Sequence, residues 1–185
     1  MHMVFDPDTA WAELQARAER LLEHPKDLEP REPIRRYGSI LRIWHFPAAG
    51  PQTTWTILGP GKKVPPGSLP IVREVSWDRE ADRQRLFGSP GAHAATLISV
   101  RVRDARLSDA DLRRRLEAGA HLAVPLVACS NTVGVDGDYF GMETYEGSPF
   151  VRLQWWGDGP SEWRHFTDWV AELRSFLLRR LDGAE

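Results

Sequence analysis

Residues 131–156 read NTVGVDGDYFGMETYEGSPFVRLQWW and contain the clearest fold signal in the chain. Asp136-Gly137 is a dipeptide that favours type I′ hairpin turns, and Gly147-Ser148 has glycine first, as type II′ turns prefer. A two-residue turn fixes which residues lie opposite each other in the strands that it joins. The stretch therefore predicts three antiparallel strands joined by these two turns.

Both turns predict the same division of side chains between the two faces of these strands. The inner face is almost wholly apolar, with the pairs Val133–Phe140, Phe140–Trp155, Met142–Leu153 and Thr144–Val151. The outer face has the pairs Tyr139–Trp156, Gly141–Gln154, Glu143–Arg152 and Tyr145–Phe150. A slip of one residue in either register would destroy this agreement, so each turn assignment supports the other.

The outer face is the candidate functional surface. Aromatic pairs that flank a Glu–Arg pair form the kind of patch that protein partners bind, provided that the patch is exposed. The candidate partner-binding residues are Tyr139, Glu143, Tyr145, Arg152, Gln154 and Trp156. The alternative is that another part of the chain covers these aromatic side chains.

Residues 160–181 form the clearest predicted helix. Pro160 suits the first helical turn, and apolar residues recur at helical spacing up to Leu181. The short connection 157–159 would fold this helix back onto the inner face of the strands. We therefore expect Trp163, Phe166 and Val170 to pack on that face.

The remaining sequence completes a single α+β domain over residues 1–185. Residues 8–23 predict an N-terminal helix, residues 24–36 a proline-punctuated linker, and residues 39–156 a sheet with short helices at 78–87 and 108–118. We expect an antiparallel or mixed sheet of six or seven strands. The N- and C-terminal helices are both expected to pack on one face of it.

Composition narrows the classes of function. The net charge of −2 disfavours a nucleic-acid partner, and no apolar run is long enough to span a membrane. Cys129 is the single cysteine and no signal peptide is visible, so we expect a cytoplasmic protein. The chain is tryptophan-rich, with 8 Trp. The sequence does not indicate an oligomeric state.

Catalytic chemistry has little support in the sequence. The six histidines lack metal-ligand spacing, and Cys129 follows an apolar run that favours burial. We therefore expect a non-catalytic protein-binding domain with no catalytic residue, metal or cofactor. The alternative is a small hydrolase or metal-dependent nuclease, with a site assembled from dispersed residues: His121, Asp136, Asp138 and Glu143.

The C-terminal strand–strand–helix carries a resemblance. Its Tyr-Phe-Gly-Met-Glu strand, Arg-Leu-Gln-Trp-Trp strand and Pro-Ser-Glu-Trp helix start look similar to the ends of small bacterial proteins of the immunity or antitoxin kind. The resemblance covers about 30 residues, and its motifs are structural. It implies a protein partner but brings no site residues with it.

Overall fold

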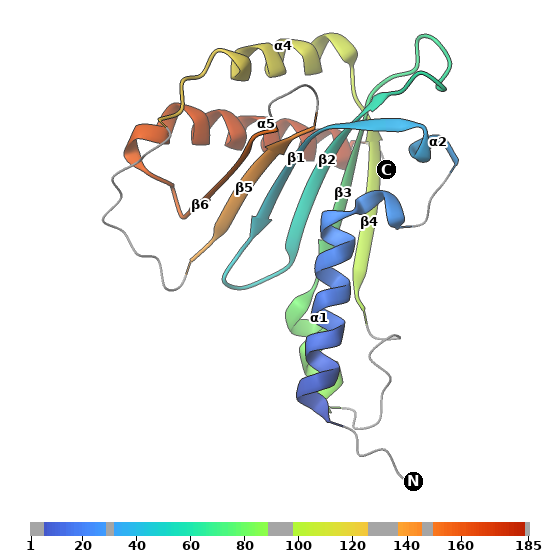
Figure 1. Cartoon of the computed structure of the whole chain (residues 1–185), viewed down its shortest axis with the longest axis vertical. Helices are drawn as coiled ribbons and strands as arrows, with labels where there is room; N and C mark the ends of the chain where they lie inside the picture. The colour runs from blue at the N-terminus through green and yellow to red at the C-terminus, as the bar shows by residue number, and fades with distance from the viewer. Residues whose placement is uncertain (1–5, 29–31, 89–97, 126–136, 146–149, 184–185) are drawn as a thin grey trace.

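A computed structural model describes residues 6–28, 32–88, 98–125, 137–145 and 150–183 of the chain (Figure 1). The described residues form a six-stranded antiparallel sheet in the order β4-β3-β2-β1-β5-β6. The strands are β1 (Tyr37–Phe46), β2 (Gln52–Pro60), β3 (Ile71–Trp77), β4 (Val100–Arg106), β5 (Tyr139–Thr144) and β6 (Arg152–Trp156). The predicted α+β fold with an antiparallel sheet is confirmed.

Helices lie on both faces of this sheet. The α-helices are α1 (Pro7–Glu23), α2 (Glu32–Arg35), α3 (Arg79–Gly88), α4 (Asp109–Ala120) and α5 (Arg164–Asp182). Short 3₁₀ turns occur at η1 (Pro25–Asp27) and η3 (Ser161–Trp163). The segment 24–36, which we expected to be a linker, therefore contains a 3₁₀ turn and one turn of α-helix.

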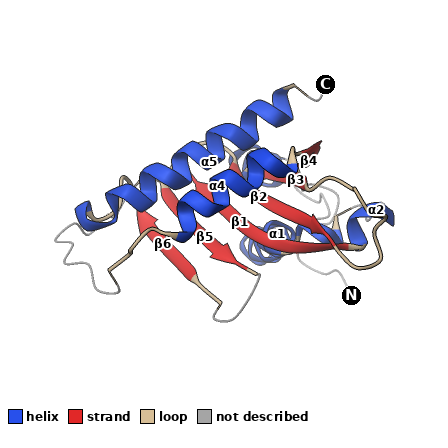
Figure 2. Cartoon of the chain, turned by 90° about the horizontal axis from the view of Figure 1, so that it is seen from above, coloured by secondary structure: helices blue, strands red, loops and turns tan. Residues whose placement is uncertain are grey.

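The prediction that both terminal helices pack on one face is wrong. Figure 2 shows α4 and α5 on one side of the strands and α1 on the other. The sequence of β3 explains the difference, because its apolar residues point both ways: Val72 packs with α5, whereas Val75 and Trp77 pack with α1. A strand that is apolar on both faces needs a layer on each side.

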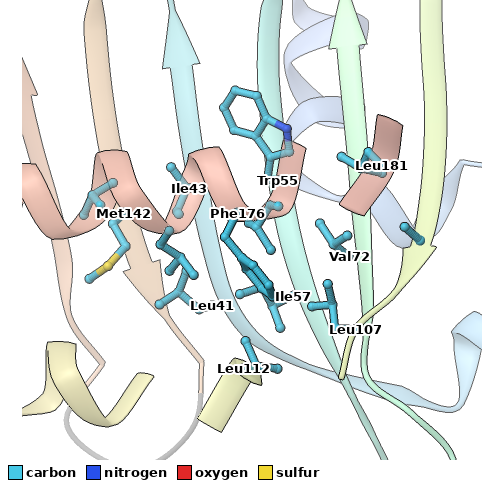
Figure 3. Close-up of a cluster of buried hydrophobic side chains, with 14 of the residues drawn as sticks. Leu41, Ile43, Trp55, Ile57, Val72, Leu107, Leu112, Met142, Phe176 and Leu181 are labelled. Atoms are coloured by element: carbon cyan, nitrogen blue, oxygen red, sulfur yellow. The ribbon is translucent and has the colours of Figure 1, made fainter. Parts of the chain in front are cut away.

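The larger core lies between the sheet and the pair α4 and α5 (Figure 3). Helix α5 buries one side, formed by Phe166, Val170, Leu173, Phe176, Leu177 and Leu181. Its first turns meet the inner face of β5 and β6, where the Phe166 and Trp155 rings lie 5.4 Å apart. The expected packing of this helix on Met142 and Trp155 is confirmed.

The register of β5 and β6 agrees with the two-turn interpretation over the described residues. Tyr139 pairs with Trp156, Phe140 with Trp155, and Glu143 with Arg152. The expected Val133–Phe140 pair is not tested, because Val133 lies outside the described residues; on the side away from β6, Phe140 pairs with His45 of β1. Residues 131–136 lie outside the described residues, and β1 takes the place beside β5 that we expected them to fill.

Candidate functional site

Helix α1 covers only part of its own face of the sheet. Its buried residues Leu14, Ala18 and Leu22 pack with Val75 and Trp77 of β3. In Figure 1, α1 runs along β3 and β4, and no described helix covers β5 and β6 on that side. This outer face therefore has no described helix over it, and on it Tyr139, Gly141 and Glu143 lie beside the paired residues Arg152, Gln154 and Trp156.

Exposed apolar side chains gather on this outer face. Among the described residues, six large hydrophobic side chains are exposed, and four of them lie between residues 145 and 156. Tyr145 is 41% exposed, Phe150 59% and Trp156 51%, and all three lie on the outer face, whereas Val151 alternates to the other side. An aromatic cluster of this kind is typical of a surface that binds a partner.

Trp44 of β1 supports the exposed residues from the side. Its indole lies across Gly141 of β5, where any larger residue would place a Cβ atom inside the ring. The guanidinium carbons of Arg42 and Arg152 each lie 5.2 Å from the centre of the ring. Trp44 is buried as a result. A glycine within a strand often marks such a close approach, and Gly141 was the one sequence signal of this contact.

Glu143 lies beneath the outer face rather than on it. It is only 3% exposed, and its Oε1 atom lies 2.8 Å from Nε of Arg42. The Tyr145 hydroxyl donates a hydrogen bond to the same oxygen. Burial and this hydrogen bond raise the pKa of the Tyr145 hydroxyl well above its usual value. Of the predicted binding residues, Glu143 is therefore placed to hold its neighbours in position.

Arg152 retains hydrogen-bonding capacity at the surface. Its Nε atom lies 3.9 Å from Glu143 Oε2, beyond hydrogen-bond distance, and its side chain is 43% exposed. Two guanidinium groups, those of Arg42 and Arg152, thus share the single carboxylate of Glu143. Among the described residues, this part of the outer face has two guanidinium groups and one carboxylate.

The remaining two predicted residues connect with these side chains. The Tyr139 and Trp156 rings lie 4.9 Å apart. With its amide oriented to satisfy its neighbours, Gln154 donates to the Tyr139 hydroxyl at 2.6 Å and accepts from Arg152 Nε at 3.1 Å. The structure thus brings all six predicted residues together on adjoining strands, four of them in one hydrogen-bonded or stacked row.

The described residues of the alternative hydrolase or nuclease site, His121, Asp138 and Glu143, do not come together. Asp138 accepts a hydrogen bond from His45 at 2.8 Å, and this bond lowers the pKa of the Asp138 carboxyl. Glu143 lies on the opposite face, His121 caps the end of α4, and Asp136 lies outside the described residues. Across the described part of the chain, no three His, Cys, Asp or Glu residues are grouped so that they could hold a metal ion.

Comparison of the chain with family models, with curated proteins and with solved structures gives no match. Within the described ranges, every helix is too short or too polar to cross a bilayer.

Proposed function

We propose that this chain is a protein-binding domain that docks its partner on the outer face of β5 and β6. The observation that carries the proposal is the gathering of Tyr145, Phe150 and Trp156, three exposed aromatic residues, on one side of a hairpin. Aromatic residues contribute much of the binding free energy at protein interfaces, because each removes a large area from water with little loss of side-chain entropy.

The charges on the outer face define the kind of partner. Arg152 can donate further hydrogen bonds, because Glu143 already binds Arg42 and Tyr145. A partner that places a carboxylate against Arg152, within a surrounding apolar patch, would complement both features. The buried Arg42–Glu143 pair and the Trp44–Gly141 contact hold the surface in shape before binding. Such preorganisation lowers the entropy cost of association.

Photo-crosslinking can identify the partner and also show where on this domain it binds. A benzoylphenylalanine residue replaces Phe150 in one sample and Phe87, which is 45% exposed on α3, in the other. Cells of the source organism supply the candidate partners. We expect one protein to be crosslinked from position 150 and not from position 87. Equal crosslinking from both positions would contradict the proposal.

Affinity measurements with the purified partner then test the surface itself. The double variant Tyr139→Ala/Trp156→Ala is expected to weaken binding by about 100-fold or more, since two anchors at about 2 kcal/mol each are lost. Arg152→Glu should weaken it by at least about tenfold through repulsion of the partner's carboxylate. Phe87→Ala serves as the matched control and should bind as the native chain does. A partner that binds the folded double variant with unchanged affinity rules the proposal out.

A further inference from the structure

A cavity of about 480 Å³ opens on the other side of β5 and β6, beneath the first turns of α5. Phe140 and Trp155 form its sheet side, and Thr167, Val170 and Ala171 form its helix side. Its volume lies within the range of about 300–1,000 Å³ that small-molecule sites occupy. Phe140 and Trp155 point away from the outer face, so this cavity is separate from the protein-binding surface proposed above.

The floor of the cavity is a row of aromatic rings. Phe140 stacks on the His45 imidazole with centroids 4.3 Å apart and parallel planes. On its other side, Phe140 lies nearly parallel to Trp155 at 6.0 Å. A flat apolar floor of this kind suits an aromatic or branched aliphatic group.

Arg174 of α5 contributes an unpaired cation to the wall. Its guanidinium carbon lies 5.6 Å from the Phe140 ring centre and 6.0 Å from that of Trp55. Its Nε atom is buried without a hydrogen-bond partner, and no described carboxylate lies within ion-pair distance of the guanidinium. The charge of Arg174 does help to lower the pKa of the Asp138 carboxyl in the same wall, but that carboxylate is hydrogen-bonded to His45. Buried donors are rarely left unsatisfied, so the Nε–H group of Arg174 suits an acceptor that a ligand supplies. A carboxylate matches its planar donor geometry best.

Asp158 contributes an unpaired anion to the same cavity. It lies between Gly157 (φ +54°) and Gly159 (φ +77°), two left-handed residues that close the tight turn after β6. Asp158 is exposed and forms no ion pair with a described residue. Of the other carboxylates of the wall, Asp138 bonds His45, and Asp168 has Arg164 3.8 Å away as an exposed ion pair without a hydrogen bond. Among the described residues of the wall, Arg174 and Asp158 are thus the two charged groups with neither a hydrogen bond nor an ion pair.

We propose that this cavity binds a small zwitterion, a free α-amino acid with an apolar side chain. The carboxylate of the ligand binds Arg174, its ammonium group faces Asp158, and its side chain lies on Phe140 and Trp155. Each of the three features matches one part of the ligand. A simple anion or a simple cation would satisfy only one of the two free charges.

Isothermal titration with each of the proteinogenic amino acids tests the ligand class. Saturable binding is expected for one or more apolar amino acids at submillimolar to millimolar concentration. For L-phenylalanine, hydrocinnamate lacks the ammonium group and phenethylamine lacks the carboxylate, and each is expected to bind at least about tenfold more weakly. Failure of every amino acid to bind overturns the proposal. Equal affinity for L-phenylalanine and both analogues also overturns it, because the cavity would then recognise only the apolar group.

Two variants test the assigned contacts. Arg174→Met replaces a buried donor that lacks a partner with an apolar side chain, so the variant is expected to fold. Because the cation is lost, its affinity for the amino acid should fall at least about tenfold. Asp158→Asn is expected to weaken amino-acid binding but not hydrocinnamate binding. Arg179→Met, on the exposed side of the same helix, is the matched control. An Arg174→Met protein that binds with native affinity refutes the assignment.

Discussion

The face of the sheet that meets α1 contains two buried arginines in two different settings. Arg73 of β3 lies where α1 covers the sheet, and Arg42 of β1 lies at the border of the uncovered part. Both donate to backbone carbonyls near the end of α1: Arg73 to Pro25 and Leu28, and Arg42 to Leu22. The last carbonyls of a helix lack partners within it, so Arg42 stabilises the end of α1 through Leu22. Arg73 holds the η1 turn and Leu28, which directly follow α1.

The two regions differ in which part of the chain covers the sheet. Over β3, the helix and the η1 turn provide the second layer, and Arg73 completes it with a two-pronged bond to Asp104. Over β1 and β5, no described helix forms a second layer, and the Trp44 indole covers Gly141, with Arg42 and Arg152 beside the ring. The Trp44 indole covers the middle of β1 and β5 but not the edge strand β6. In this region the side chain of a strand residue, Trp44, takes the place that a helix takes over β3, and the surface at β6 stays uncovered by the described helices.

Removal of the arginine in the covered region should have the largest effect on stability. Arg73→Met breaks the pair with Asp104 and leaves the carbonyls of Pro25 and Leu28 without a donor. The expected cost is about 3–5 kcal/mol, as for other buried pairs that lose one partner. Urea denaturation measures it. Arg106→Met, an exposed position on β4, should change the unfolding free energy by less than about 0.5 kcal/mol. Equal effects of the two variants would show that Arg73 does not anchor the α1 end.

In the uncovered region, Gly141→Ala should have an intermediate effect. The added methyl group overlaps the Trp44 indole, so the ring must leave its position between Arg42 and Arg152. Overpacking of this kind costs about 1–3 kcal/mol. Denaturant unfolding measures the stability. The chain has 8 Trp, so the fluorescence change due to Trp44 is isolated by comparison with the same substitution in a Trp44→Phe chain.

The matched control is Gly38→Ala on β1. Nothing lies within 4 Å of a Cβ atom at that position, so this variant should be neutral. If Gly141→Ala were also neutral and left the fluorescence unchanged, Trp44 would not be the layer that closes this region.

The contrast between local and distant contacts explains what could be predicted from the sequence. The β5–β6 register follows from Gly147-Ser148 and from alternation over a few residues on each side, so the pairs Tyr139–Trp156 and Glu143–Arg152 are predictable. The inward placement of Phe166 and Val170 is local for the same reason, because it follows from helical spacing.

Contacts between β1 and β5 join residues about a hundred positions apart, and no turn signal specifies them. The burial of Glu143 by Arg42 and the contact of Trp44 with Gly141 both depend on that pairing. The pairing of Phe140 with His45 is a distant contact of the same kind. The sequence does not indicate Arg174 either, because its lack of a hydrogen-bond partner depends on how α5 packs against the sheet.

The smallest effect is expected at the edge of the uncovered region, where Tyr145 contacts Glu143. Tyr145→Phe removes one hydrogen bond to a carboxylate and should cost about 1 kcal/mol near neutral pH. The pKa of Tyr145 is raised in the folded state, so the unfolded chain loses the phenolic proton first as the pH rises. The contribution of the protonated Tyr145 hydroxyl to the free energy of unfolding is therefore fully present below about pH 10 and is lost progressively above that pH. Urea midpoints between about pH 9 and pH 11 should fall more steeply for the native chain than for Tyr145→Phe. Parallel curves for the two proteins would mean that Tyr145 is not held by Glu143, and that Glu143 organises the outer face through Arg42 alone.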